Sequence, residues 1–192
     1  RQIRTIYAAS TSLLNLVNDL LDYARMDTGS AGEIEETLFS VDSVLSEVRQ
    51  LLAPLVEHYG TEYEISVPED TRFRGDPQLL CRVLTNLASN AIEAAGEGGT
   101  VEVEVSARED GLVIDVVDDS DDADISRIEC LLSRPEGETV TECVGQKRQG
   151  RSHGLGLLIC GRLVDAAGGR ADVERLEGDS VGGGPPGRSS TR

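Results

Sequence analysis

A glycine-rich turn leads directly into a patterned helix in the stretch "RSHGLGLLICGRLVDAAGG", which runs from Arg151 to Gly169. Gly154 and Gly156 flank a single leucine, and apolar residues then recur at helical spacing until a second glycine pair ends the pattern. Glycine N–H groups can approach a phosphate closely because no Cβ intervenes, and the helix dipole adds positive potential there. The stretch therefore predicts either a phosphate-binding helix N-terminus or a turn whose glycines permit tight packing.

Basic side chains stand just before this turn. Lys147, Arg148 and Arg151 precede Gly154 and could neutralise further phosphate charge. They belong to a polar stretch, residues 134–152, that carries no apolar periodicity. A loop of that length in a compact domain is usually a lid or a disordered segment.

Two asparagines share one face of another helix. The apolar pattern after Pro77 predicts a helix through Ala95, and Asn86 and Asn90 lie one helical turn apart on it. Burying two amides costs free energy unless they find partners. Hydrogen bonds from helix to loop explain most such pairs, but a carboxamide oxygen also suits Mg²⁺, which takes few protein ligands.

An aspartate ends one of the predicted strands. The segments "VEVEVSA" and "LVIDVVD" alternate in hydropathy, and the "REDG" between them is typical of a hairpin turn. Asp118 closes the second strand and follows Val116 by two, which puts both on one face. A carboxylate there can accept a hydrogen bond from an exocyclic amine such as that of adenine, although a solvated aspartate is the commoner case.

The remaining pattern predicts an α+β fold in two layers. Ser40 can cap a helix that follows it, a short helix is expected in "ISRIECLL", and further strands in "EYEISV", "RFRG" and "RADVERLE". Helices and antiparallel strands are segregated along the chain, as in a two-layer sandwich. We expect this domain to span residues 39–178, between a linker at 30–38 and a flexible, truncated tail at 179–192.

The first segment stands apart from this domain. Apolar residues between Ile3 and Ala24 follow alternating spacings of three and four, which is the seam of a coiled coil. One helix cannot bury such a stripe alone. Residues 1–29 therefore predict a partial dimerisation helix, completed by a second chain or by an upstream helix that this sequence lacks.

Composition excludes several classes of function. The formal net charge is −17 and the isoelectric point about 4.4, which disfavours binding of nucleic acid through phosphate contacts. No apolar run approaches the roughly 18 residues that a membrane span needs. The acidic, lysine-poor composition fits a salty cytoplasm and a high-GC genome equally. The four cysteines form no C-x-x-C pair, so we expect no zinc site and a reduced setting rather than a disulfide scaffold.

The order of these motifs resembles the catalytic and ATP-binding domain of sensor histidine kinases. The likeness rests on "RVLTNLASNAIEAA", on the aspartate-ended strand and on "GLGLLICGRLVDAAGG". In addition, "LLNLVNDLLDYARMDTG" is similar to the second helix of that family's dimerisation and phosphotransfer domain. The resemblance implies a Bergerat-type (GHKL) sandwich, a cytoplasmic region of a possibly membrane-anchored parent protein, a homodimer through residues 3–24 and a response-regulator receiver domain as partner.

The resemblance also implies a role for each candidate residue. Asn90 holds Mg²⁺, Asn86 lines the triphosphate side, and Asp118 reads the adenine of ATP. The choice between Asp118 and Asp119 at the adenine is open, and strand phase favours Asp118. Related ATPases of this fold carry a glutamate where this chain has Asn86. Since an asparagine cannot act as a general base, phosphoryl transfer to a protein histidine is favoured over ATP hydrolysis. The expected contacts of the cofactor are Asp118, Arg148, Arg151, Gly154, Leu155, Gly156 and Leu157, with residues 134–152 as the ATP lid.

The chain departs from the family pattern at three places. His58 and His153 both lie off the first helix, so the phosphoacceptor histidine is expected outside this sequence. The family's D-x-G-x-G loop reads "DDSDDA", with Ser120 and Asp122 in place of both glycines. Like charges ~6 Å apart cost about 2–3 kcal/mol at an effective dielectric constant of ~20, so Asp122 is expected to weaken nucleotide binding. The expected last strand is missing.

Three alternatives remain. A nucleotide-blind pseudokinase could regulate a partner kinase or receiver through the first helix. A protein-serine kinase or ATPase of the same fold is disfavoured by Asn86. The acidic run from Asp118 to Glu129 also mimics the spacing of an EF-hand calcium loop, but Ala123 replaces the required glycine and a strand precedes the run.

Overall fold

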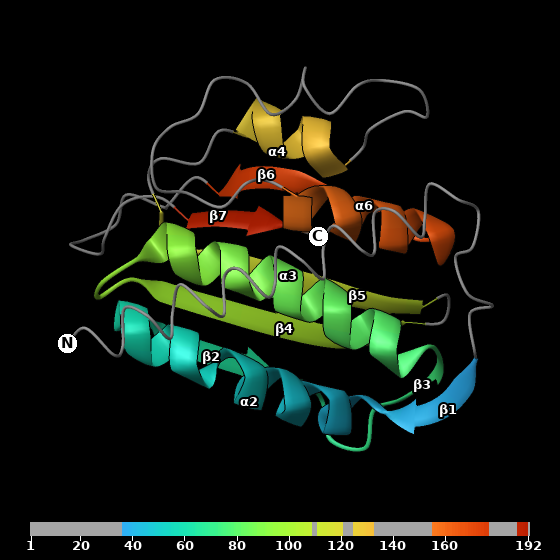
Figure 1. Ribbon diagram of the computed structural model, residues 1–192. Coiled ribbons are helices and arrows are strands. Elements are labelled where there is room, and N and C mark those ends of the chain that lie inside the picture. Colours follow the sequence, from blue (N-terminus) through green and yellow to red (C-terminus); the bar gives the residue numbers. More distant parts are fainter. Residues whose placement is uncertain (1–35, 109–110, 121–124, 133–154, 177–187, 192) are drawn as a thin grey trace.

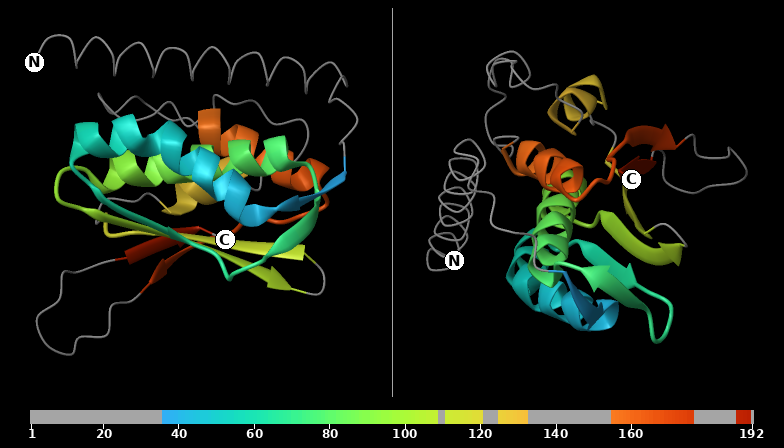
Figure 2. Two further views of the ribbon diagram at one scale, coloured as in Figure 1. Left: turned by 90° about the horizontal axis from the view of Figure 1, so that it is seen from below. Right: turned by 90° about the vertical axis from the view of Figure 1, so that its right-hand side faces the viewer.

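Helices lie side by side on one face of a five-stranded sheet in the computed structural model (Figure 1, Figure 2). The structure describes residues 36–108, 111–120, 125–132, 155–176 and 188–191. The helices are α2 (Val41–Tyr59), α3 (Pro77–Ala95), α4 (Ile125–Leu132) and α6 (Leu155–Ala166). α3 packs between α2 and α6 over the sheet, so the expected two-layer α+β sandwich is confirmed.

The sheet has the strand order β2-β4-β5-β7-β6. Its strands are β2 (Glu62–Ser66), β4 (Thr100–Arg108), β5 (Gly111–Asp118), β6 (Val173–Leu176) and β7 (Arg188–Thr191). The hairpin of β4 and β5 is confirmed. β2 pairs with β4 in parallel, contrary to the expectation of antiparallel strands, because the chain crosses over through α3 between them.

Two strands lie where none was expected. β1 (Thr37–Ser40) pairs with β3 (Arg72–Gly75) in a separate two-stranded sheet, and it overlaps the expected linker. β7 lies in the expected tail and inserts between β5 and β6, so the last strand is present rather than missing. The segment "RSST" carries no apolar alternation, and only the open backbone groups of its two neighbours make it a strand.

The core is built from aliphatic side chains at strand and helix periodicity. Val101, Val103 and Val105 of β4 are at most 1% exposed, whereas Glu102 and Glu104 between them face solvent. Their partners are the buried faces of the helices, namely Val41, Val44, Leu45, Val48 and Leu52 of α2, Leu80, Val83, Leu84, Leu87, Ala88, Ala91 and Ile92 of α3, and Leu158, Ile159, Cys160 and Leu163 of α6. α2 and α3 therefore bury one stripe against the sheet, and α6 packs against α3 and α4.

Local signals fix where the helices begin. The Asp76 side chain caps α3 by accepting from the N–H groups of Gln78 at 2.8 Å and Leu79 at 3.2 Å, and Pro77 occupies the first turn. Ser40 occupies the cap position of α2, but its side chain makes no capping hydrogen bond. The hydroxyl of Ser43 instead donates to the Ser40 carbonyl at 2.7 Å.

A glycine lets α4 cross closely over α6. A Cβ on Gly161 would lie 3.0 Å from Leu132 Cα and closer still to the Leu132 carbonyl oxygen. Real Cβ atoms do not approach backbone so closely, so the contact between the two helices depends on glycine at this position.

The cysteines do not behave alike. Cys81 and Cys160 are free thiols, and burial raises the pKa of Cys160 to about 12. Cys130 is disulfide-bonded, a bond that the expectation of a reduced setting did not include. Distant spacing in the sequence gave no sign of this bond because the fold decides which thiols meet.

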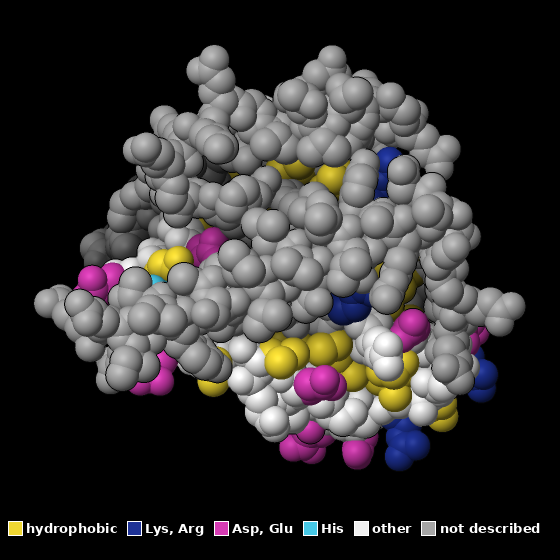
Figure 3. Space-filling model, viewed as in Figure 1, with side chains coloured by type: hydrophobic (Ala, Val, Ile, Leu, Met, Phe, Trp, Pro, Cys, Tyr) yellow, Lys and Arg dark blue, Asp and Glu magenta, His cyan; other side chains and the backbone are white. Residues whose placement is uncertain are grey.

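The surface of α2 is partly apolar. Among the described residues Leu51 of α2 is 54% exposed, and Leu38 of β1, which leads into α2, is 59% exposed. Figure 3 shows apolar atoms gathered on the lower part of that face, where α2 lies. No helix in the described part of the chain is long and apolar enough to cross a bilayer. The expected dimerisation helix, residues 1–29, lies outside the described residues.

Candidate functional site

The N-terminus of α6 meets the two asparagines of α3. A Cβ on Gly156 would lie 3.5 Å from Asn90 Nδ2 and 3.6 Å from Asn86 Oδ1. Gly156 is the second residue of α6, so its N–H is one of the first in the helix and has no carbonyl partner within it. The structure therefore brings together three residues that the sequence analysis had linked from separate motifs.

The side chain of Asn90 is held by a hydrogen bond within its own helix. Asn90 Nδ2 donates to the Asn86 carbonyl at 2.6 Å, and Ser89 Oγ donates to the same carbonyl at 3.1 Å. Both asparagine side chains are half-buried, between the exposed surface and the core. Carboxamide side chains in this place offer oxygen ligands to a hard cation next to the positive end of a helix. The donor set thus fits a cation that accompanies phosphate.

Asp118 lies on the side of the sheet that the helices cover. It lies opposite Val101 of β4, which is 1% exposed, and it stands two residues after the buried Val116 on β5. Residues directly opposite each other in an antiparallel pair project from the same face. The Asp118 carboxylate also accepts a hydrogen bond from the Ser120 N–H at 3.0 Å, which fixes its orientation.

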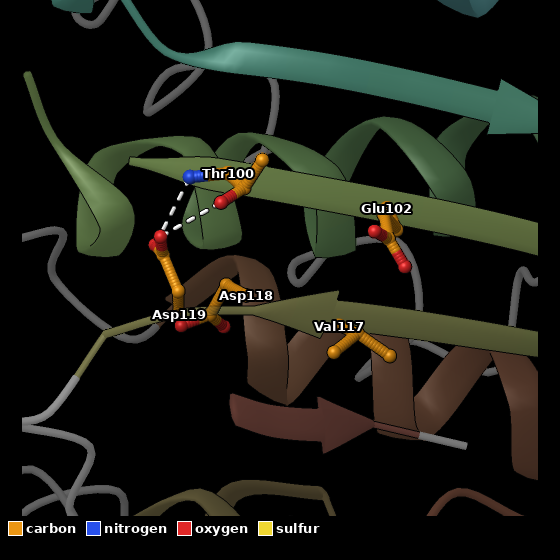
Figure 4. A pocket seen from close by; sticks show the side chains of 5 residues that line it. All are labelled: Thr100, Glu102, Val117, Asp118 and Asp119. Atoms are coloured by element: carbon orange, nitrogen blue, oxygen red, sulfur yellow. Dashed lines mark hydrogen bonds between the residues drawn. The ribbon is translucent and has the colours of Figure 1, made fainter. Parts of the chain in front are cut away.

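The carboxylate of the next residue, Asp119, is hydrogen-bonded to β4 instead. Asp119 accepts from Thr100 at both the N–H, at 3.0 Å, and the hydroxyl, at 2.7 Å (Figure 4). A small surface cavity borders this pair and is lined also by Glu102, Val117 and Asp118. Since Asp119 is engaged by the first residue of β4, Asp118 is the carboxylate that the strand directs toward the helix layer.

Ser120 adopts an ordinary backbone conformation. Asp70 is the only non-glycine residue with a positive φ within the described ranges, so Ser120 does not need the freedom of a glycine. Its hydroxyl is buried and has no hydrogen-bond partner in the part of the chain that the structure describes. From the sequence, Ser120 stood as a replaced glycine and as one position of the calcium-like run, and its burial could not be predicted from that loop.

Most of the other residues predicted to contact the nucleotide lie outside the part of the chain that the structure describes. Lys147, Arg148, Arg151 and Gly154 lie outside the described residues, as do the ATP-lid stretch 134–152 and residues 121–124 of the calcium-like run, which include Asp122. α6 begins at Leu155, whose side chain is not described. Leu157 is partly buried, and its side chain packs against the core.

Comparison with known proteins identifies the family. Residues 75–187, more than half of the chain, match the family described as histidine kinase-, DNA gyrase B-, and HSP90-like ATPase. The chain therefore belongs to this family.

Its relatives are sensor kinases. The sensor histidine kinase AruS of Pseudomonas aeruginosa is 34% identical over 188 residues, which cover 93% of this chain and 18% of AruS. The sensor protein SphS of Synechococcus elongatus is 33% identical over 158 residues, covering 81% of this chain and 38% of SphS. The chain thus spans well under half the length of these curated relatives.

Solved structures agree on the fold. Full-length ShkA in complex with AMPPNP superposes with a TM-score of 0.65 at 27% identity, covering 96% of this chain and 35% of ShkA. The histidine kinase ThkA in complex with the response regulator TrrA superposes with a TM-score of 0.63 at 21% identity, covering 99% of this chain and 49% of that chain. The second likeness shows the fold alone.

Proposed function

We propose that the contact between α3 and α6 binds Mg·ATP and that the γ-phosphoryl group is transferred to a histidine of a protein. The observation that carries the proposal is Gly156, whose bare backbone lies against Asn86 and Asn90 at the start of α6. A Cβ at this point would fill the space between the amides and the helix N-terminus. Glycine keeps that space available for phosphate oxygens.

Each residue has a distinct role in this proposal. The oxygen of Asn90 binds Mg²⁺, Asn86 lines the triphosphate side, and the first N–H groups of α6 hold phosphate. Asp118 accepts from the amino group of adenine, which its position on the helix-covered face of β5 supports. The backbones of Gly154, Leu155 and Leu157 and the side chains of Arg148 and Arg151 complete the phosphate contacts, with residues 134–152 as the lid.

The chemistry follows from what the site contains. Mg²⁺ neutralises charge on the phosphates when it is bound. The chain's own residues orient the nucleotide and stabilise charge, and those two effects dominate phosphoryl transfer. Asn86 cannot take a proton from water, so the site favours a protein nucleophile over hydrolysis.

The proposal extends to partners. The seam between Ile3 and Ala24 would form a homodimer with the helix that carries the acceptor histidine, and a response-regulator receiver domain would take the phosphoryl group onward. The complex of ThkA with the response regulator TrrA supports the receiver. We propose domain limits of 1–29, 30–38 and 39–178, with the catalytic domain extended through β7, and a cytoplasmic site of action.

Calorimetric titration with ATP, with and without Mg²⁺, tests the function. We expect Asn90→Ala to weaken Mg·ATP binding about tenfold or more, equivalent to about 1.4 kcal/mol or more, and to remove the increase in affinity that Mg²⁺ gives the unsubstituted chain. The reason is the loss of the oxygen ligand.

Ser89→Ala is the matched control. The Ser89 hydroxyl and the Asn90 amide both donate to the Asn86 carbonyl. The variant loses the hydrogen bond of Ser89 but keeps the cation ligand, Asn90. It should bind like the unsubstituted chain. If the unsubstituted chain gives no heat at millimolar Mg·ATP, the site is not a nucleotide site, and the chain acts instead as a nucleotide-blind regulator.

A further inference from the structure

A buried hydroxyl without a partner lies next to Asp118. Ser120 Oγ is shielded from solvent and makes no hydrogen bond within the described residues. Native proteins leave few buried polar groups unsatisfied, because an unmade hydrogen bond costs the full desolvation of the group. An unpaired buried hydroxyl at a ligand site indicates a group that forms its hydrogen bond with the bound ligand.

The residue that carries this hydroxyl is hydrogen-bonded to Asp118 through its backbone. The Ser120 N–H donates to Asp118 Oδ1 at 3.0 Å, and the hydroxyl belongs to the same residue as that N–H. The carboxylate of Asp119 does not compete, because Thr100 engages it with two hydrogen bonds. The end of β5 therefore presents an acceptor, Asp118, beside a hydroxyl that can donate.

We propose that Ser120 is a specificity-determining residue of the ATP site, whose hydroxyl donates to N1 of adenine while Asp118 accepts from the 6-amino group. This inference deepens the proposed function and rests on it. Adenine presents an amino donor next to the N1 acceptor, which complements a carboxylate next to a hydroxyl. Guanine presents a carbonyl oxygen and an N1–H there, so its oxygen would face the carboxylate.

The position of the phosphates selects N1 over N7. The phosphates belong at Gly156 on α6, and N1 is the ring nitrogen more remote from the sugar that carries them. An adenine that reaches Asp118 from that direction brings its N1 edge to the end of β5 first. Ser120 in this chain thus supplies a contact that a glycine at the same position could not.

The test is a thermodynamic cycle of two proteins and two nucleotides. Calorimetry on the full 192-residue chain and on Ser120→Ala gives the Kd for ATP and for 1-deaza-ATP, in which N1 is replaced by C–H. We expect Ser120→Ala to weaken ATP binding about three- to tenfold, the effect of one hydrogen bond, and to leave 1-deaza-ATP binding unchanged. With 7-deaza-ATP, which keeps N1, the loss should equal that with ATP.

Two further measurements separate recognition from structure. Without nucleotide, Ser120→Ala should not lower the free energy of unfolding, because the hydroxyl has no described partner to lose. Ser120→Thr keeps a hydroxyl and should retain the preference for ATP over 1-deaza-ATP. Equal losses for ATP and 1-deaza-ATP would overturn the inference and leave the proposed function intact, whereas failure of the unsubstituted chain to bind ATP would overturn the function itself.

Discussion

At the scale of the residue, the proposed nucleotide site depends on the absence of a Cβ at Gly156. Gly156 stands in ordinary contact distance of both asparagines, so the space that it leaves is just large enough to be closed by one methyl group. The same residue is unremarkable by local conformation, since it is not among the described glycines with a positive φ. In the proposed function a glycine is needed here because phosphate oxygens approach its backbone, not because the backbone conformation requires one.

We therefore expect Gly156→Ala to separate binding from folding. A Cβ at 3.5–3.6 Å from the amides makes no clash, and alanine favours the helix by about 0.5–1 kcal/mol over glycine. The free energy of unfolding in urea should stay equal or rise, while calorimetry should show Mg·ATP binding weakened about tenfold or more. Undiminished binding by a folded variant would show that phosphate does not approach this backbone.

Close helix packing operates at the scale of the element. Gly161 lies further along α6 than Gly156, and a Cβ there would strike the backbone of Leu132 rather than open space. Gly156 and Gly161 of α6 thus have different roles. The first keeps the site open, and the second lets α4 cross.

Gly161→Ala should accordingly destabilise the chain. The clash with backbone cannot be relieved by a side-chain rotation, so we expect a loss of about 1–3 kcal/mol in the free energy of unfolding, measured with urea. Gly156→Ala, in the same helix, is the control. If Gly161→Ala proves as stable as the unsubstituted chain, α4 does not pack on α6 as described.

Charge acts at the scale of the whole molecule. The solvent-facing side of the sheet carries Glu64 opposite Glu102 and Glu104 opposite Asp115, in a chain with a net charge of −17. Like charges directly opposite each other on a sheet are destabilising, and salt screens them. The fold therefore bears an electrostatic cost that depends on ionic strength.

Thermal unfolding should reveal this cost. We expect the Tm to rise between about 0.1 M and about 1 M NaCl, and Glu104→Gln to reduce the rise because one like-charge pair is removed. Glu69→Gln, in the exposed loop after β2, removes the same charge without a cross-strand partner. An identical salt response in the two variants would place the cost elsewhere in the molecule.

Much of this protein could be read from the sequence by itself. Periodicity located α3, α4 and the hairpin of β4 and β5, and a proline marked where α3 begins. Those features depend on interactions between residues close in the chain, so local pattern carries them. The family, too, follows from short motifs in a fixed order.

Only the tertiary structure decided the rest. β7 is a strand because β5 and β6 offer it backbone partners, and β2 runs parallel to β4 because α3 intervenes. Likewise, the choice between Asp118 and Asp119 depends on Thr100, which lies far away in the sequence. Burial and partnership are properties of groups that meet through folding, and the spacing of residues along the chain does not specify which groups will meet.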